Sequence, residues 1–231
     1  MKKTTKLVLS AVLAASASMG STQAAIFAGD LIGIDFGTSA PDAGDNFNVI
    51  GSFDSDIALN RYSDNAATGV TIQVSGPGAA GGYNNSDPSA GSAGEISPFQ
   101  DAHMEDWLGI FGGGVGTRVT LLTFKNLDDT LRYDLTAVIG QFSGNTSFDG
   151  QVISVSGQDS DSFGTVSTAG EPVYTSLSGL KSTDKTLVVV LSNASTANHA
   201  LSALTLTAVP EPSTSALIGL GGLALIMRRR K

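Results

Sequence analysis

The chain has 231 residues, and the stretch from residue 25 to residue 209 is long enough for one domain with its own hydrophobic core. This stretch holds 20 acidic and six basic residues, a net charge of about −14, so nucleic acid and anionic lipid surfaces make poor partners. The absence of cysteine excludes disulfides, thiolate catalysis and Cys-ligated metal, and two histidines are too few for a His-rich metal site.

The first 24 residues have the order of a secretory signal peptide. Three lysines within the first six residues precede an apolar run over 7–15, and small residues follow as far as Ala24. A cationic start, a short apolar segment and small side chains at the cleavage positions are the features that signal peptidase reads. We therefore expect cleavage between Ala24 and Ala25. A short buried helix at the N-terminus of a cytoplasmic protein is the alternative.

Strand signals dominate residues 26–209. The segment 131–139 alternates apolar and polar side chains, which predicts a strand with one buried face. Shorter β-branched or apolar runs predict further strands at 70–74, 118–124, 152–155 and 201–206, and the continuous apolar run 187–191 predicts an inner strand. Many short strands joined by Gly-rich turns indicate an all-β fold, a single β-sandwich over 25–209.

Two segments interrupt this pattern. Residues 75–94 contain Tyr83 as their only large apolar side chain, which predicts a long exposed loop. Residues 97–100, Ser-Pro-Phe-Gln, form a capping box with proline at the first helical position, and Gly109 can end the helix. We therefore expect one short helix over 98–108, with His103 as a solvated helix residue.

Three short motifs resemble galactose-binding-like jelly-roll domains of secreted bacterial proteins. These are Ile-Gly-Ile-Asp-Phe-Gly at 32–37, Asn-Leu-Asp-Asp-Thr-Leu-Arg-Tyr-Asp-Leu-Thr at 126–136 and Leu-Ser-Ala-Leu-Thr-Leu at 201–206. The resemblance implies that an early and a late strand lie in one sandwich. It also implies that loops at one rim bind glycans or a structural calcium ion.

No catalytic motif is present in the sequence. A nucleophile elbow needs Gly-x-Ser-x-Gly, which no serine has, and His103 and His199 are too far apart for a zincin motif. We interpret the domain as non-catalytic. Because a glycosidase needs only two suitably placed acids, a secreted glycan hydrolase is the alternative.

Two acidic pairs are candidate ligands of a structural calcium ion; no other cofactor is expected. Asp54 with Asp56, and Asp159 with Asp161, place carboxylates two residues apart, which allows both to face one hard cation. Position twelve of an EF-type loop starting at Asp159 is glycine, so the EF-hand pattern fails. Solvated turns are the alternative for both pairs.

Exposed aromatic side chains are the candidates for glycan contact, because sugar rings stack on them. Trp107, Tyr62 and Tyr83 are these candidates, with Arg61 as a neighbouring hydrogen-bond donor. Packing beneath the short helix is the alternative role of Trp107.

The C-terminal segment combines an extended tripeptide, a short apolar run and a cationic end. Two prolines keep Pro210-Glu211-Pro212 extended and unable to join a helix or an inner strand. The apolar run 216–227 would cover about 18 Å as a helix, a marginal span for a hydrocarbon core of about 30 Å. The basic end should stay in the cytoplasm and leave the domain outside; it contains Arg228, Arg229, Arg230 and Lys231.

This combination resembles the PEP-CTERM sorting signal of Gram-negative bacteria. The resemblance implies export, transient anchoring in the inner membrane through 216–227, and processing by an exosortase near Pro210, Glu211 and Pro212. It also implies a link to biofilm and exopolysaccharide production. We therefore expect an exported surface or matrix protein whose partner is exopolysaccharide or another cell-surface glycan. The same segment ends some ice-binding proteins, so ice binding is a third hypothesis.

Overall fold

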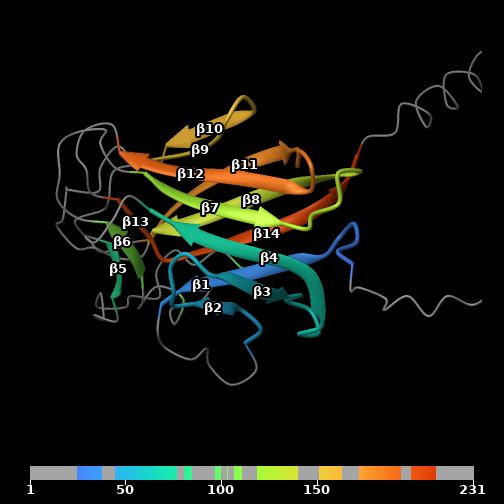
Figure 1. Ribbon diagram of the computed structural model, residues 1–231, viewed down its shortest axis with the longest axis horizontal. Coiled ribbons are helices and arrows are strands. Elements are labelled where there is room, and N and C mark those ends of the chain that lie inside the picture. Colours follow the sequence, from blue (N-terminus) through green and yellow to red (C-terminus); the bar gives the residue numbers. More distant parts are fainter. Residues whose placement is uncertain are drawn as a thin grey trace, which may run out of the picture.

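The chain folds into two facing β-sheets with a small third sheet at one end of the sandwich (Figure 1). The structure is a computed structural model that describes residues 25–37, 45–76, 81–84, 97–99, 103, 107–110, 119–139, 151–162, 172–193 and 199–211. The predicted all-β sandwich is confirmed. The predicted signal segment 1–24 and apolar run 216–227 lie outside the described residues.

The five-stranded sheet unites the first and last strands of the domain. Its strands lie in the order β11 (Val173–Leu180), β8 (Leu131–Ile139), β14 (Ala203–Pro210), β1 (Leu31–Phe36) and β2 (Asn48–Ile50). β1 pairs antiparallel with β14, and only the pairing of β1 with β2 is parallel within this sheet. The jelly-roll resemblance implied that an early and a late strand share one sandwich, and here they are direct neighbours in one sheet.

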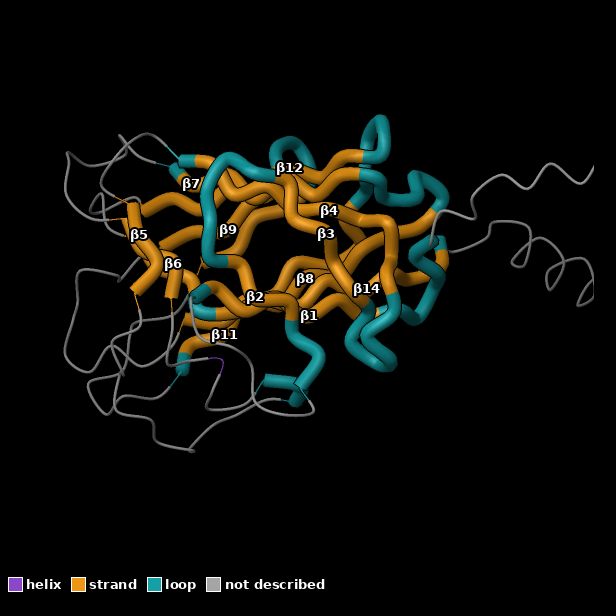
Figure 2. Tube along the Cα trace, turned by 60° about the horizontal axis from the view of Figure 1, so that its bottom comes forward, coloured by secondary structure: helices purple, strands orange, loops and turns teal. Residues whose placement is uncertain are grey.

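The six-stranded sheet faces this layer across the core, and Figure 2 shows the two layers one above the other. Its order is β10 (Asp159–Ser162), β9 (Gln151–Val155), β12 (Thr186–Asn193), β7 (Thr120–Lys125), β4 (Ala67–Ser75) and β3 (Asp56–Asn60). β12 lies between β9 and β7, so the predicted inner strand is confirmed.

The small sheet corrects two sequence predictions. It contains β13 (His199–Leu201), β6 (Trp107–Ile110) and β5 (Gly81–Asn84). The predicted loop 75–94 is therefore interrupted by a strand. The predicted helix 98–108 is wrong at both ends, because Pro98 lies in a turn and Trp107 and Leu108 belong to β6. Pairing with β5 and β13 satisfies the backbone of β6, which outweighs a local capping pattern.

The core fills the space between the two large sheets. In β8, Tyr133, Leu135, Ala137 and Ile139 are buried and Leu131 is half-buried, which confirms the predicted apolar face. Successive side chains of a strand point to opposite faces, so every second residue of β8 points into the space between the two sheets. Each fully buried large apolar side chain contributes about 1.5–3 kcal/mol, so these inward faces hold the layers together.

Tyr133 carries a polar group into this core and satisfies it there. Its hydroxyl donates to the carbonyl of Asp128 (3.0 Å) and accepts from the Asp128 N–H (2.8 Å). These two bonds close the turn between β7 and β8 over the end of the core. Burial raises the pKa of Tyr133 to about 12.

Because burial raises the pKa of Tyr133, we expect the domain to lose stability at alkaline pH. An unfolded tyrosine ionises near pH 10, whereas the folded Tyr133 keeps its proton until about pH 12. Between these values the folded state binds more protons than the unfolded state, so the free energy of unfolding falls as pH rises. We expect Tyr133→Phe to lower this free energy by about 1–3 kcal/mol at neutral pH and to flatten the alkaline slope. Urea unfolding between pH 8 and 12 tests this, with Tyr62→Phe as the matched control; an unchanged slope in Tyr133→Phe would contradict it.

Both ends of the described domain lie at the same end of the sandwich, on the right in Figure 1. The Gly29 N–H donates to the Ala208 carbonyl (2.7 Å), and the Ala208 N–H donates to the Asp30 carbonyl (2.9 Å). Contrary to the sequence prediction, Pro210 is part of an inner strand: it ends β14, opposite Leu131 of β8. The pairing with the N-terminal segment stops at Ala208, and a strand tolerates proline at such an end.

Among the described residues, no helix is long and apolar enough to cross a bilayer.

Candidate functional site

Four aromatic side chains form a row on the outer face of the five-stranded sheet. The aromatic row consists of Tyr62, Phe47, Phe99 and Tyr174. Ring centroids are 5.5 Å apart between Tyr62 and Phe47, 5.9 Å between Phe47 and Phe99, and 5.7 Å between Phe99 and Tyr174. These are the distances of tilted and edge-to-face aromatic pairs, which are stabilising.

The row is buried in its middle and partly exposed at both ends. Phe47 and Phe99 are buried, and they pack with Val138 of β8 and Ala203 of β14. Val138 alternates with the core residues of β8, so it faces away from the space between the sheets. Tyr62 and Tyr174 keep part of their surface in solvent. The two tyrosines are therefore anchored by the rings between them while remaining accessible.

Gly33 of β1 makes room for the middle of the row. A Cβ on residue 33 would lie 2.9 Å from three ring carbons of Phe47. This is closer than real carbon contacts, so any side chain here would push the ring off the sheet. The glycine is required by this close approach.

Two asparagines hold the segments that carry Phe47 and Tyr62. The Asn48 side-chain amide donates to the carbonyls of Gly33 (2.8 Å) and Asn60 (2.9 Å), and its oxygen accepts from the Asn60 N–H (2.7 Å). The Asn46 amide donates to the Tyr62 carbonyl (2.7 Å). Because these bonds fix the backbone, Tyr62 is held in place before any ligand arrives.

His103 packs against the row and is fully buried, so the prediction of a solvated histidine is wrong. Its ring stacks on Phe47 with centroids 3.8 Å apart, and its Nε2 pairs with the buried carboxylate of Asp45. A buried polar pair is stable only when its members satisfy each other. The pair links residue 103 to the segment before β2, next to Phe47.

Arg61 pairs with two carboxylates, so its guanidinium is not free for a ligand beside Tyr62. Its Nη1 pairs with Asp30 (3.0 Å) and its Nε with Asp64 (3.0 Å). Two carboxylates thus occupy the guanidinium, although Arg61 is the chain neighbour of Tyr62.

Tyr83 and Trp107 lie in the small sheet, in β5 and β6. In the register of these strands Tyr83 is opposite Leu108, and Trp107 is opposite Asn84. Their side chains lie outside the described residues. The structure thus places these two predicted glycan contacts in the small sheet, whereas Tyr62 lies in the turn after β3 and packs on the outer face of the five-stranded sheet.

The two acidic pairs have different surroundings. Asp56 begins β3, and its carboxylate pairs with Lys125 (2.6 Å), while Asp54 precedes it in the left-handed region (φ 57°).

Asp159 and Asp161 lie in the edge strand β10 rather than in a turn. The Thr175 hydroxyl donates to Asp161 (2.6 Å), and this bond lowers the pKa of Asp161 below its usual range. Across the described segments, no three His, Asp or Glu side chains gather as a metal site. The calcium site stays a prediction.

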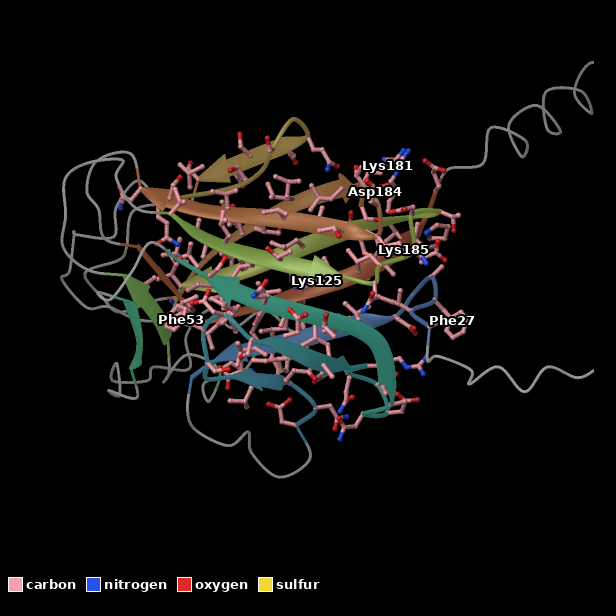
Figure 3. The ribbon with its side chains drawn as sticks, in the orientation of Figure 1. Phe27, Phe53, Lys125, Lys181, Asp184 and Lys185 are labelled. Atoms are coloured by element: carbon pink, nitrogen blue, oxygen red, sulfur yellow. The ribbon has the colours of Figure 1, made fainter. Side chains whose placement is uncertain are left out.

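A pocket of about 450 Å³ opens at the end of the sandwich where both chain ends leave. The N-terminal residues Ala25 and Ile26 line it together with the turn 126–130 and Lys185. The Thr130 hydroxyl and N–H donate to Asp128, and they lower the pKa of this carboxylate. Figure 3 shows Lys185 and the 60 % exposed Phe27 at this same end. The pocket therefore adjoins the point where the predicted signal peptide would be attached.

Glu211 follows β14 directly and is attached to the sandwich. Its carboxylate accepts from Nη2 of Arg132 in β8 (2.5 Å). Residues 208–231, which include this glutamate, match the PEP-CTERM protein-sorting motif. The chain carries a PEP-CTERM sorting signal. A protein with this signal is exported and sorted to the surface as an exosortase substrate.

The PEP-CTERM chain is also similar to two solved extracellular structures. One is a chain in the crystal structure of plant peptide RALF23 in complex with FER and LLG2, at 11% identity over 83% of this chain and 54% of that one (TM-score 0.45). The other is the ANXUR2 extracellular domain from Arabidopsis thaliana, at 8% identity over 78% of this chain and 42% of that one (TM-score 0.41). The PEP-CTERM chain spans about half the length of these structures or less. No curated protein matches its sequence.

The sequence analysis named Tyr62 as a candidate glycan contact but did not name Tyr174, which lies in the same aromatic row. Tyr174 shares the outward parity of Ser176 and Ser178 along β11, while Thr175 and Leu177 are buried. An aromatic side chain among outward-facing serines is a signal of surface function that the sequence does contain.

Proposed function

We propose that this PEP-CTERM protein is a non-catalytic surface or matrix protein whose sandwich binds glycan through the aromatic row. The signal peptide directs export and is cleaved after Ala24, the domain 25–209 folds outside the inner membrane of a Gram-negative cell, and residues 216–227 hold the chain there until an exosortase acts. The aromatic row carries the proposal, because two partly exposed tyrosines are fixed on one face by buried rings.

The chemistry of the row suits a sugar chain. The apolar face of a pyranose ring stacks on an aromatic ring, and tyrosine adds a hydroxyl that can hydrogen-bond sugar hydroxyls. Ordering a mobile side chain costs affinity, and the hydrogen bonds to Asn46 and Asn48 reduce this cost for Tyr62. A neutral glycan or a weakly charged one fits best, because the domain carries an excess of carboxylates.

Removing either tyrosine ring should weaken glycan binding. We expect Tyr62→Ala and Tyr174→Ala each to lower the affinity for exopolysaccharide from the producing cell by about two- to tenfold, since one stacked ring contributes about 0.5–1.5 kcal/mol. Purified residues 25–209 are tested by co-sedimentation with the polysaccharide. Phe27→Ala, an exposed aromatic at the end of the sandwich, is the matched control and should bind like the wild type.

The same experiment separates binding from hydrolysis. Equal binding by the wild type and both tyrosine variants would contradict the proposed site. Release of reducing sugar by the purified domain would instead favour the glycan hydrolase.

A further inference from the structure

The sorting signal and the folded domain overlap at the end of β14. The PEP-CTERM match begins at Ala208, whereas β14 extends to Pro210. Val209 lies opposite Arg132 in the neighbouring strand β8, and Pro210 lies opposite Leu131. The glutamate of the signal is therefore attached to a residue that is still part of the sheet.

Arg132 holds this glutamate. On an antiparallel sheet, the residue two positions beyond the direct partner lies diagonally across, within reach of a long side chain. Glu211 stands in this relation to Arg132, and the two side chains form an ion pair at 2.5 Å. The side chains are 28% and 45% exposed, so the pair is a surface contact that opens and closes readily.

The membrane leaves little room between the sandwich and the processing enzyme. The apolar run begins at residue 216, and the five residues from Glu211 to that point reach at most about 18 Å when fully extended. The headgroup region alone takes up about 5–8 Å of this distance. The end of β14 therefore stays close to the bilayer surface while the apolar run is inserted.

An enzyme that cleaves a peptide takes the chain into its active site in extended form, so a segment that is still paired in a sheet is shielded from it. In the folded domain, β8 covers one edge of β14 as far as Pro210, and Arg132 occupies the carboxylate of Glu211. Peeling Val209 to Glu211 off β8 frees both the backbone and the glutamate and adds about 10 Å of reach.

We propose that Arg132 is a latch that holds the sorting signal closed on the folded sandwich, and that exosortase processing proceeds from the state in which the end of β14 has detached. This inference rests on the proposed sorting of the chain and names a residue that controls its rate. The latch makes the folded domain compete with the enzyme for Glu211.

The test compares the processing rates of full-length variants in the native host. Pulse–chase labelling, membrane fractionation and the mass of the released protein measure these rates. Loss of an exposed ion pair should raise the detached population, so we expect Arg132→Gln to be released about two- to fivefold faster. Arg132→Lys keeps the charge and should be released at about the wild-type rate. Lys125→Gln breaks the comparably exposed pair with Asp56 on the other sheet and is the matched control (Figure 3).

A reversible crosslink tests the detachment directly. Directly opposed residues of antiparallel strands have Cα atoms about 4.5–5.5 Å apart, which suits a disulfide. The chain has no other cysteine, so Arg132→Cys combined with Val209→Cys can form one defined bond. We expect the oxidised double variant to stay unprocessed, the reduced one to be released, and Arg132→Cys alone to be faster than the wild type.

The outcomes separate this inference from the sorting proposal. Release of Arg132→Gln at the wild-type rate or more slowly, or equal release of the oxidised and reduced double variants, overturns the latch. Normal processing of Glu211→Ala in the same host overturns the sorting role itself. If Glu211→Ala stays in the membrane and one of the first two results is also found, the latch is overturned and the sorting role stands.

Discussion

A chain carrying Glu211→Ala is expected to be exported and folded but to remain in the membrane fraction at its unprocessed mass. The predicted signal peptide is unchanged, so we expect export to proceed, and the loss of an exposed ion pair costs the domain at most about 1 kcal/mol. The enzyme, however, loses the only charged group of the stiff tripeptide Pro210-Glu211-Pro212. We expect a near-complete loss of release, measured by fractionation and by the mass of the mature protein in its native host.

Two further variants make this result specific. Asp184→Asn removes an exposed acid from a turn of the sandwich and should be processed like the wild type. Replacing Arg228, Arg229 and Arg230 with serine should produce a different defect. Without these cationic residues the short apolar run is no longer held in the membrane, and we expect it to pass through uncleaved. Release of Glu211→Ala with the wild-type C-terminus would show that 216–227 is only a tail.

Phe47→Ala is expected to destabilise the domain by about 3–5 kcal/mol, the usual cost of emptying the site of a buried phenylalanine. The ring fills the space left by Gly33 and contacts Tyr62, Phe99 and His103. Its removal therefore opens a cavity against the sheet and leaves the buried pair of His103 and Asp45 without its cover. Urea unfolding of residues 25–209 measures the change.

The matched control is Phe27→Ala, because Phe27 is 60 % exposed and surface substitutions usually change stability by less than about 0.5 kcal/mol. Phe47→Leu should lie between the two, since leucine fills part of the cavity. If Phe47→Ala costs no more than Phe27→Ala, the aromatic row does not support the sheet, and the binding role of Tyr62 loses its physical basis.

Sequence reasoning succeeded where local periodicity decides the structure. The segment 131–139 forms β8 with the predicted face buried. Apolar residues at every second position all point to the same side of a strand, so this pattern by itself indicates which side is buried. It failed at both ends of 98–108, because a capping box describes a local preference, whereas β6 exists through pairing with residues 81–84 and 199–201. It failed at His103 because burial depends on Phe47 and Asp45, which are distant in the chain.

By itself, the sequence determined the route of this protein and the class of its fold. The sorting signal is short, and its parts follow one another along the chain, so its residues stand together in the sequence. The tertiary structure alone decided which aromatic rings meet and that Glu211 reaches Arg132, 79 residues away in the chain. Such contacts depend on which strands become neighbours and in which register, and no local pattern contains that information.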